Sequence, residues 1–130
     1  MPFIRITILA PLLTAEQIGR IQQGTTELMQ SIMRKPAVGI AVLVERVEHG
    51  AWTIANCPVG LAAHVEATIG LGINTAAEKA RFMAEMWQLL RSTLGPELRD
   101  ETYLVCHEVD TKTYGRGGLT RNARDRQHSS

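Results

Sequence analysis

The chain opens with Met1-Pro2-Phe3-Ile4-Arg5-Ile6-Thr7-Ile8-Leu9, and this stretch decides the fold. From Phe3 to Leu9 it is rich in β-branched residues, and isoleucine recurs at every second position, which is typical of a strand with one buried face. The opposite face would carry Arg5 and Thr7. A strand that begins at residue 2 or 3 ties the N-terminus into a sheet, so we expect the first residues to be held in place.

The residue at the tip of this strand is Pro2. If Met1 is removed, the nitrogen of Pro2 becomes a free secondary amine that is rigid and able to take a proton. While Met1 stays, that nitrogen is a tertiary amide without useful basicity. Methionine aminopeptidases generally accept a small second residue, proline included. Pro2 is therefore a candidate general base, although proline is also an unremarkable residue at this position.

The chain contains an internal repeat. When the sequence is shifted by 61 residues, Ile6-Thr7-Ile8 falls on Ala67-Thr68-Ile69, and Thr14-Ala15-Glu16-Gln17 falls on Thr75-Ala76-Ala77-Glu78. Both threonines have Gln or Glu three residues later, which is the capping-box pattern at the start of a helix. Each half is therefore predicted to contain a strand, a helix, a second strand and a short turn with an aromatic residue.

The predicted fold is α+β and forms one domain over residues 1–130, with repeats at about 2–59 and 62–119 and a polar, loosely held tail at 120–130. We expect helices at about 15–33 and 76–93, and further strands at about 39–47, 62–71 and 102–109. The second helix is expected to bury Ala80, Met83, Met86, Trp87 and Leu90. The long crossovers imply a parallel strand pair within each half. Two tandem β-α-β units then give a four-stranded sheet with two helices on one face, and the half-apolar opposite face predicts an oligomer.

Composition argues against several classes of function. A net charge of +1 argues against a protein that holds nucleic acid by its phosphates. No apolar run approaches the ~18 residues of a membrane span, and the N-terminus does not resemble a signal peptide. Cys57, Cys106 and the histidines show no metal-ligand spacing. We therefore expect reduced thiols, a cytoplasmic location, and no metal or other cofactor.

Pro2, the strand from Phe3 to Leu9, the capped Thr14-Ala15-Glu16-Gln17 and the aromatic Trp52 together resemble the tautomerase superfamily. The resemblance is to the 4-oxalocrotonate tautomerase group in its fused form, in which two short subunits are joined, and it extends to about Leu119. It implies a tautomerase/MIF-like β-α-β fold and an N-terminal proline that acts as general base or acid without a cofactor. It also implies a homotrimer.

The resemblance assigns two residues to the walls of the family pocket, but the two carboxylate-binding arginines of the family have no counterpart here. Leu9 and Trp52 match apolar and aromatic walls of the family pocket. The arginines that hold substrate carboxylates in the family are both absent here. Their positions fall on Leu12 and Ala41 in the first half, and on Ile73 and Tyr103 in the second.

One basic residue occupies the repeat of the pocket-lining turn. Arg116 follows Tyr114 by two residues, and its counterpart in the first half is Ile54. A guanidinium grips a carboxylate through two hydrogen bonds, so we predict Arg116 as a relocated anchor for an anionic substrate. Tyr103 or Tyr114 could donate a hydrogen bond to the substrate oxygen.

The predicted activity is that of a tautomerase, a keto-enol isomerase that acts on a small enolisable keto acid. Moving a proton next to a carbonyl needs a base near neutrality. A free α-amine has a reference pKa of about 7.7–8.0. Burial among Leu9, Trp52 and Tyr114 is expected to lower the pKa of Pro2, so that the amine is unprotonated at pH 7.

Two alternatives stay open. A relative of these enzymes could instead hydrate, dehalogenate or decarboxylate a small acid. Those reactions usually need a carboxylate near the proline, and none stands out in the sequence. The chain could also be a non-catalytic oligomeric module with a decayed pocket, because both family arginines are lost. In that interpretation Trp52 and Tyr114 pack turns, and Arg116 is a solvated turn residue.

Overall fold

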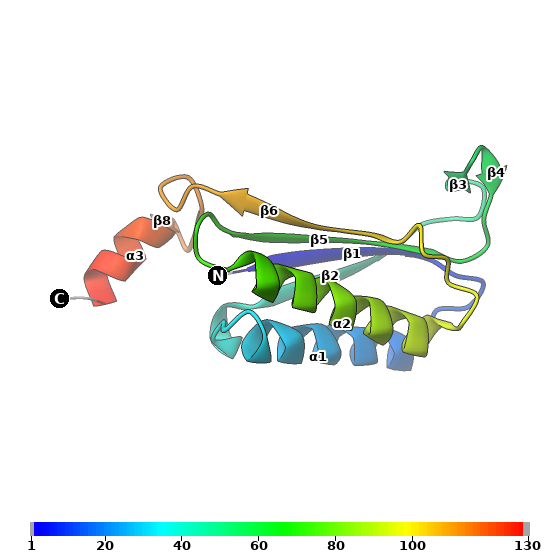
Figure 1. Cartoon of the computed structure of the whole chain (residues 1–130), viewed down its shortest axis with the longest axis horizontal. Coiled ribbons are helices and arrows are strands. Elements are labelled where there is room, and N and C mark those ends of the chain that lie inside the picture. Colours follow the sequence, from blue (N-terminus) through cyan, green and yellow to red (C-terminus); the bar gives the residue numbers. More distant parts are fainter. Residues whose placement is uncertain (1, 129–130) are drawn as a thin grey trace.

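The computed structural model describes residues 2–128 and centres on a mixed sheet with the strand order β2-β1-β5-β6 (Figure 1). These strands are β1 (Phe3–Leu9), β2 (Ala41–Arg46), β5 (Ala62–Gly70) and β6 (Tyr103–Val109). β1 pairs in parallel with β2, and β5 pairs in parallel with β6. β1 and β5 are antiparallel and join the two pairs. The predicted α+β fold with a parallel pair in each half is confirmed.

β1 lies inside the sheet and supplies the centre of the core. Ile4, Ile6 and Ile8 are at most 1% exposed, as the alternating pattern predicts. They pack in one cluster with Phe82 and Met86. The hydrophobic effect therefore fixes which face of β1 points inward, since a slip of one residue would bury the polar set instead.

Helices α1 (Ala15–Ser31) and α2 (Ala76–Leu94) pack against each other on one face of the sheet (Figure 1). Thr14 and Thr75 are their N-caps, and both complete a capping box, as predicted. The prediction that Ala80 faces the core is wrong, because Ala80 is exposed. The buried stripe of α2 is rotated and runs through Phe82, Met86, Leu90 and Thr93.

Two short hairpins lie at opposite ends of the sheet (Figure 1). The first is formed by β3 (Thr53–Ile54) and β4 (Cys57–Pro58), and the second by β7 (Gly115–Arg116) and β8 (Leu119–Thr120). In the second hairpin the strands approach very closely, because a Cβ built on Gly115 would lie 2.0 Å from the carbonyl oxygen of Leu119. Glycine is therefore required at this position.

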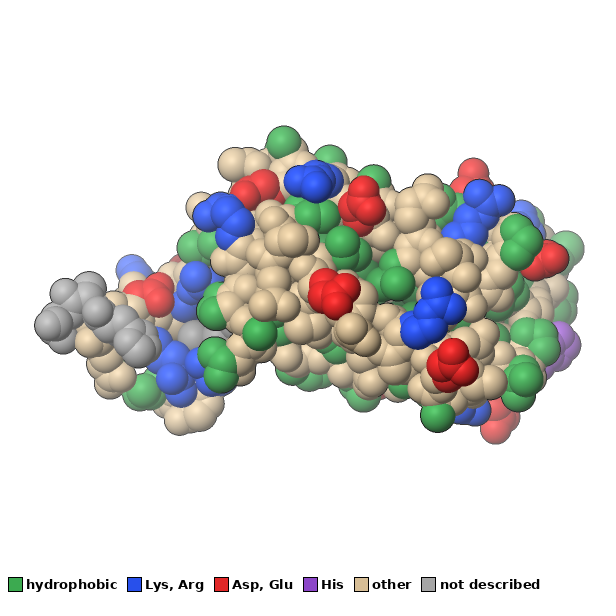
Figure 2. Space-filling model, turned by 90° about the horizontal axis from the view of Figure 1, so that it is seen from below, with side chains coloured by type: hydrophobic (Ala, Val, Ile, Leu, Met, Phe, Trp, Pro, Cys, Tyr) green, Lys and Arg blue, Asp and Glu red, His purple; other side chains and the backbone are tan. Residues whose placement is uncertain are grey.

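The predicted loose tail is instead partly helical. Residues Arg121–His128 form α3, and the Thr120 hydroxyl accepts a hydrogen bond from the Ala123 backbone at 3.1 Å, as a cap does. The backbone N–H of Arg121 donates to the carbonyl of Tyr114 at 2.6 Å and anchors the helix to the hairpin. α3 is not predicted from the sequence, because its residues form no apolar stripe. Figure 2 shows Lys and Arg side chains gathered where α3 meets the body of the molecule.

The sheet face opposite the helices carries apolar side chains at its surface. Phe3 is 40% exposed, Leu43 37% and Tyr103 70%. This face is therefore the predicted site of contact between copies.

None of the helices in the described part of the chain combines the length and apolarity needed to cross a membrane.

Candidate active site

Pro2 is buried at the start of β1, as the sequence predicts. Its carbonyl oxygen accepts a hydrogen bond from the backbone of Ala41 at 3.1 Å. Phe3 pairs with Thr68, so extending this register by one residue places Pro2 opposite Ile69 of β5. Strands on both sides therefore hold the proline in position. The expected removal of Met1 concerns a residue outside the described range.

Tyr114 lies beside Pro2. Its hydroxyl donates to the carbonyl oxygen of Thr68 at 3.1 Å, and Thr68 is the residue that pairs with Phe3. Burial raises the pKa of Tyr114, with a smaller opposing effect from a backbone hydrogen bond with Phe3. The phenol therefore keeps its proton at neutral pH and lies one residue along the strand from the candidate base.

Arg116 belongs to the same end of the molecule. It lines a cavity of about 370 Å³ whose other charged lining residues are Arg34, Lys35, Arg121, Arg124 and Asp125. The carbonyl oxygen of Arg116 accepts two hydrogen bonds from the Arg124 guanidinium, at 3.0 and 3.3 Å. The hairpin and α3 therefore form one wall, and the segment after α1 forms another.

Contacts around Gly70 link this cavity to the start of β1. A Cβ built on Gly70, the residue after Ile69, would lie 3.0 Å from Ile73 and 3.4 Å from the Arg121 guanidinium. Both of these side chains line the cavity. On the other side, Pro36 and Val38 line it a few residues before the backbone contact between Ala41 and Pro2. The cavity therefore lies at the end of the sheet where β1 begins, although Pro2 itself does not line it.

Lys35 is the most deeply buried charged residue of the cavity. It is 6% exposed, and its ammonium nitrogen has no hydrogen-bond partner among the described residues. Burial, together with the nearby charges of Arg121 and Arg34, lowers the pKa of Lys35 to about 8. The ammonium is therefore poorly solvated and lacks a counter-ion.

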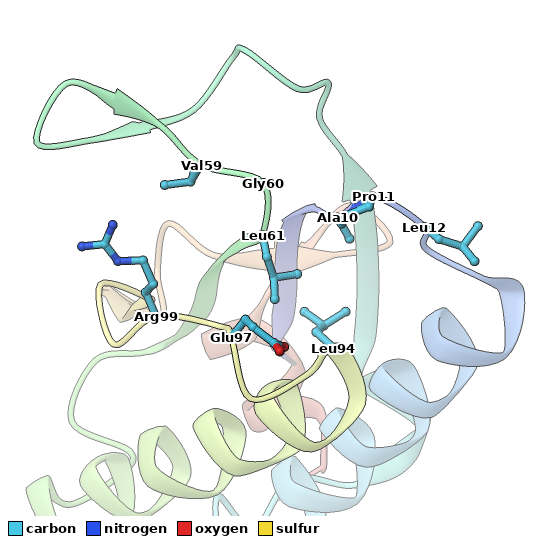
Figure 3. A pocket seen from close by; sticks show the side chains of 9 residues that line it. All are labelled: Ala10, Pro11, Leu12, Val59, Gly60, Leu61, Leu94, Glu97 and Arg99. Atoms are coloured by element: carbon cyan, nitrogen blue, oxygen red, sulfur yellow. The ribbon is translucent and has the colours of Figure 1, made fainter.

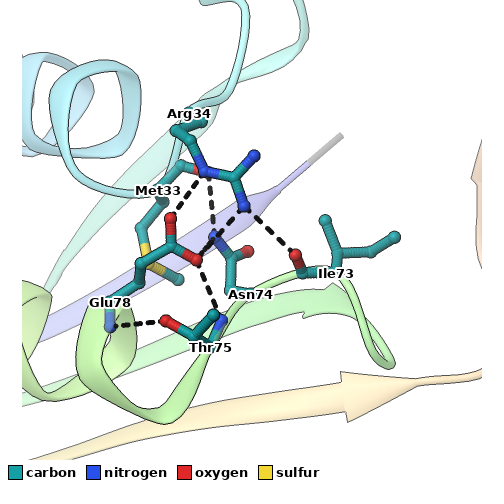
Figure 4. A network of polar contacts seen from close by, with 6 residues as sticks. All are labelled: Met33, Arg34, Ile73, Asn74, Thr75 and Glu78. Carbon is teal, nitrogen blue, oxygen red and sulfur yellow. Dashed lines mark hydrogen bonds and ion pairs between the residues drawn. The ribbon is translucent and has the colours of Figure 1, made fainter.

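Arg34 differs from Lys35 because it is already paired (Figure 4). Its guanidinium binds both carboxylate oxygens of Glu78, at 2.5 and 3.2 Å, and donates to the Ile73 carbonyl at 3.3 Å. The hydrogen bond from Arg34 and one from the Thr75 backbone hold the pKa of Glu78 at about 2. This network ties the end of α1 to the start of α2 and fixes the backbone that carries Lys35.

Leu9 and Trp52 lie at the other end of the sheet, away from Pro2 of the same chain. Leu9 pairs with Ala62 at the far end of β1, and it packs in a small cluster with Val59 and Trp52. The prediction that Pro2 is buried among Leu9, Trp52 and Tyr114 is therefore wrong for a single chain, since only Tyr114 is close. The reason is the antiparallel joining of β1 to β5, which sends the two repeated turns to opposite ends.

The far end has a different character. A cavity of about 450 Å³ lies there, lined mainly by apolar residues of the loops around Leu12, Gly60 and Leu94 (Figure 3). Arg99, which also lines it, forms an ion pair with Glu101 at 2.9 Å. Ala63, the counterpart of Pro2 in the repeat, pairs with Ile8 near this end. This end therefore has no proline amine.

Tyr103 is also separated from Pro2. It begins β6, pairs with His64 and is 70% exposed on the open face of the sheet. Near it, Glu66 accepts a hydrogen bond from His107 at 3.1 Å and lies 3.8 Å from His64. No group of His, Cys, Asp and Glu among residues 2–128 has the geometry of a metal site.

Sequence reasoning missed Lys35, Arg121 and Arg124 as residues of this site. Arg34 and Lys35 form a basic pair directly before Pro36, which was a visible signal. The burial of Lys35 was not visible, because it depends on how the folded chain packs around the segment after α1. Arg121 and Arg124 were assigned to the tail, and only the helix brings them to the cavity.

No protein-family model matches the chain, and no curated protein matches it. Solved structures do match. The crystal structure of Pt0534 inactivated by 2-oxo-3-pentynoate superposes with a TM-score of 0.85 at 14% identity, over 94% of this chain and 98% of that chain. The fused 4-OT asymmetric trimer F6 superposes with a TM-score of 0.82 at 18% identity, also over 94% and 98%.

A third match is N1, a member of the cis-3-chloroacrylic acid dehalogenase family, with a TM-score of 0.81 at 17% identity over 98% of this chain and 91% of that chain. Together these matches confirm the predicted fold, because the chain superposes over almost its whole length on fused 4-OT structures. Identities this low establish the fold and leave the chemistry to the site.

Proposed function

We propose that this protein is a cofactor-independent tautomerase in which Pro2, freed by removal of Met1, moves a proton on a small enolisable keto acid. The single observation that carries this proposal is the burial of Pro2 at the start of β1, at the same end of the sheet as a cavity lined by cations. The likeness to fused 4-OT structures supports it.

The chemistry follows from the neighbours of the amine. Burial and nearby positive charge disfavour a second cation, so the nitrogen of Pro2 keeps its lone pair near neutral pH. It takes a proton from the enol or from the carbon beside the carbonyl and returns a proton to another carbon. The Tyr114 phenol, whose one proton is donated to the Thr68 carbonyl in the structure, turns on substrate binding and donates instead to the oxygen on which charge develops. Arg116 holds the substrate carboxylate.

The complete pocket is proposed to form between copies of the chain. Leu9, Trp52 and Tyr103 are distant from Pro2 within one chain, so they can serve as substrate-binding walls only if a neighbouring copy presents them. The matching fused 4-OT structures are trimers. We therefore propose a homotrimer that packs through the open face of the sheet, where Phe3 and Leu43 are exposed.

Intact mass and ketonisation test the proposal together. The mass is expected to show loss of Met1, and the protein is expected to ketonise enol phenylpyruvate or a 2-hydroxydienoate. Pro2→Ala should remove the activity, whereas Pro11→Ala, at an exposed proline on the far loop, should retain it. Retention of Met1, or equal rates in Pro2→Ala and the unmodified protein, would refute a proline base.

A covalent probe gives a second test. Pt0534 is inactivated by 2-oxo-3-pentynoate. We expect the amine of Pro2 to add to the alkyne of this reagent, forming one C–N bond without a leaving group. The N-terminal peptide should gain the mass of the whole reagent, and the Pro11→Ala variant should react equally fast. Labelling elsewhere with Pro2 unmodified would count against a free amine at this site.

Asp125 favours a second candidate function. Its carboxylate lines the same cavity and lies 3.6 Å from the Arg121 guanidinium. A carboxylate beside the proline could activate water for hydration or dehalogenation of a small unsaturated acid, and N1 is a member of a dehalogenase family. Chloride release from cis-3-chloroacrylate that is lost in Asp125→Asn would favour this function over tautomerisation. The third possibility, a non-catalytic module, predicts no reaction in either assay.

A further inference from the structure

The cavity beside Pro2 has more positive charge than the chain itself neutralises. Five cationic side chains line it, whereas the carboxylates in contact with them are Glu78 and Asp125. Glu78 is bound to Arg34, and Asp125 lies 3.6 Å from Arg121. Lys35, Arg116 and Arg124 have no carboxylate partner in the described residues.

Lys35 is the feature that a solvated surface patch does not explain. Exposed arginines and lysines are satisfied by water, so their clustering alone would carry no argument. The ammonium of Lys35 is buried without a hydrogen bond, although the three donors of an ammonium normally find acceptors. Burial of an unpaired charge destabilises the fold. A ligand that supplies hydrogen-bond acceptors to the ammonium would therefore stabilise the folded chain.

We propose that this cavity binds a small dicarboxylate, with Lys35 as its buried anchor and Arg121 as the second cation. The ammonium is a point charge that satisfies one carboxylate at depth, and the arginines of the hairpin and α3 suit a second carboxylate through paired hydrogen bonds. A volume of about 370 Å³ is in the range of sites for small molecules.

This inference rests on the proposed function for one point only, which is that the bound dicarboxylate is the substrate. Because the cavity lies at the same end of the sheet as Pro2, a dianion that reaches from it towards the start of β1 would present the carbon between its carboxylates to the amine. Lys35 and Arg121 would then replace the two missing family arginines, from positions in the sequence that the family pattern does not use. The binding itself does not depend on Pro2.

Calorimetric titration with three probes tests the site. Succinate is the inert dicarboxylate, butyrate is the monocarboxylate of the same length, and inorganic phosphate is the competing small dianion. Succinate should bind at least about 10-fold more tightly than butyrate, since loss of one charged partner typically costs 1.5–3 kcal/mol, or about 10- to 150-fold. Tighter binding of phosphate than of succinate would overturn the dicarboxylate assignment.

Matched variants locate the binding. Lys35→Met approximately keeps the length of the side chain and removes its charge. It should weaken the binding of succinate by roughly 10- to 100-fold. Lys35→Arg should restore part of the affinity, and Arg121→Met should also weaken binding. Lys112→Met, at an exposed lysine before the β7–β8 hairpin, should bind as the unmodified protein does. Equal succinate affinity in Lys35→Met and Lys112→Met would overturn the proposal.

Pro2→Ala separates this inference from the proposed function. Succinate should bind Pro2→Ala with the affinity of the unmodified protein, because the anchor is Lys35. If Lys35 controls succinate binding but no variant has isomerase activity, the site stands and the tautomerase proposal fails. If ketonisation depends on Pro2 but succinate affinity does not depend on Lys35, the tautomerase proposal stands and the dicarboxylate site fails. Thermal unfolding of each variant confirms that the fold is kept, and Lys35→Met should be no less stable.

Discussion

The phenol of Tyr114 donates a hydrogen bond to the carbonyl oxygen of Thr68 across 3.1 Å, although 46 residues separate them in the chain. Thr68 pairs with Phe3 in the sheet, so this bond holds the β7–β8 hairpin against the end of β1. The Tyr114 side chain therefore helps to set the position of the hairpin relative to Pro2.

Replacing Tyr114 by phenylalanine tests that dependence. Tyr114→Phe keeps the ring and removes the donor, so it should lower the free energy of unfolding by about 0.5–1.5 kcal/mol in urea titrations. It should also lower the ketonisation rate, because the donor beside Pro2 is lost. Tyr103→Phe is the matched control at an exposed tyrosine, and its stability should change by less than about 0.5 kcal/mol. Equal effects in the two variants would contradict a special role for Tyr114.

The ion pair of Glu78 with Arg34 predicts a loss of stability in acid. The pKa of Glu78 in the folded chain is about 2, below its ordinary value of 4.5. The unfolded chain therefore binds the proton more readily, and the stabilisation is full above about pH 4.5 and is lost as the pH falls towards 2. Glu78→Gln should flatten the melting temperature over this window, since glutamine keeps the capping box but cannot pair with Arg34.

The control for this measurement is Glu85→Gln, at an exposed position in the middle of α2. It should leave the acid dependence of the melting temperature as it is in the unmodified protein. If Glu78→Gln and Glu85→Gln give the same curve, the network in Figure 4 does not stabilise the fold.

The sequence predicts most of the fold because its local signals are strong and agree. The alternation of isoleucines in β1, the two capping boxes and the internal repeat each point to the same β-α-β units. α3 was not predicted because seven of its eight residues are polar and carry no periodic signal, and its order comes from contacts with Tyr114 and Thr111. The error at Ala80 has a similar origin, since several stripes of α2 are apolar and only packing selects one.

The candidate site was only half predictable. Pro2, Tyr114 and Arg116 could be found because each falls at a repeated or terminal position. The antiparallel pairing of β1 with β5 could not be read from either half alone, and it is this pairing that sends Leu9 and Trp52 to the far end. The role of Lys35 in the site could not be predicted for a related reason, because its burial depends on segments that come together only in the folded chain.

The close approach at Gly115 predicts a local failure of the hairpin. A methyl group there would overlap the Leu119 carbonyl, which is backbone and cannot move aside cheaply. Gly115→Ala should therefore open β7 and β8 and reduce both ketonisation and succinate binding, while the sheet stays folded. Amide chemical shifts should change mainly between residues 110 and 124.

Gly60→Ala is the control for the hairpin, because a Cβ at Gly60 meets nothing within 4 Å and this residue lies at the opposite end of the sheet. Its activity and its amide spectrum should resemble those of the unmodified protein. Full activity in Gly115→Ala would show that the hairpin contributes nothing to the site.

The buried ammonium of Lys35 predicts a rise of stability in base. Its pKa is about 8 in the folded chain and 10.5 ordinarily, so between these values the unfolded chain binds more protons. The cost of the buried charge is therefore full below pH 8 and is relieved as the pH rises towards 10.5. The charged groups that face it are Arg121 and Arg34, which add to the cost, and Glu78, which offsets part of it.

Lys35→Met should remove that cost. At pH 7 the variant should be more stable than the unmodified protein by an amount on the order of 2 kcal/mol, and the difference should vanish above pH 10. Saturating succinate should reverse the order at pH 7, because only the unmodified protein gains a counter-ion for Lys35. Chemical denaturation at pH 7 and pH 10, with Lys112→Met as control, measures both effects. A Lys35→Met variant that is less stable at pH 7 would mean that the ammonium already has a partner.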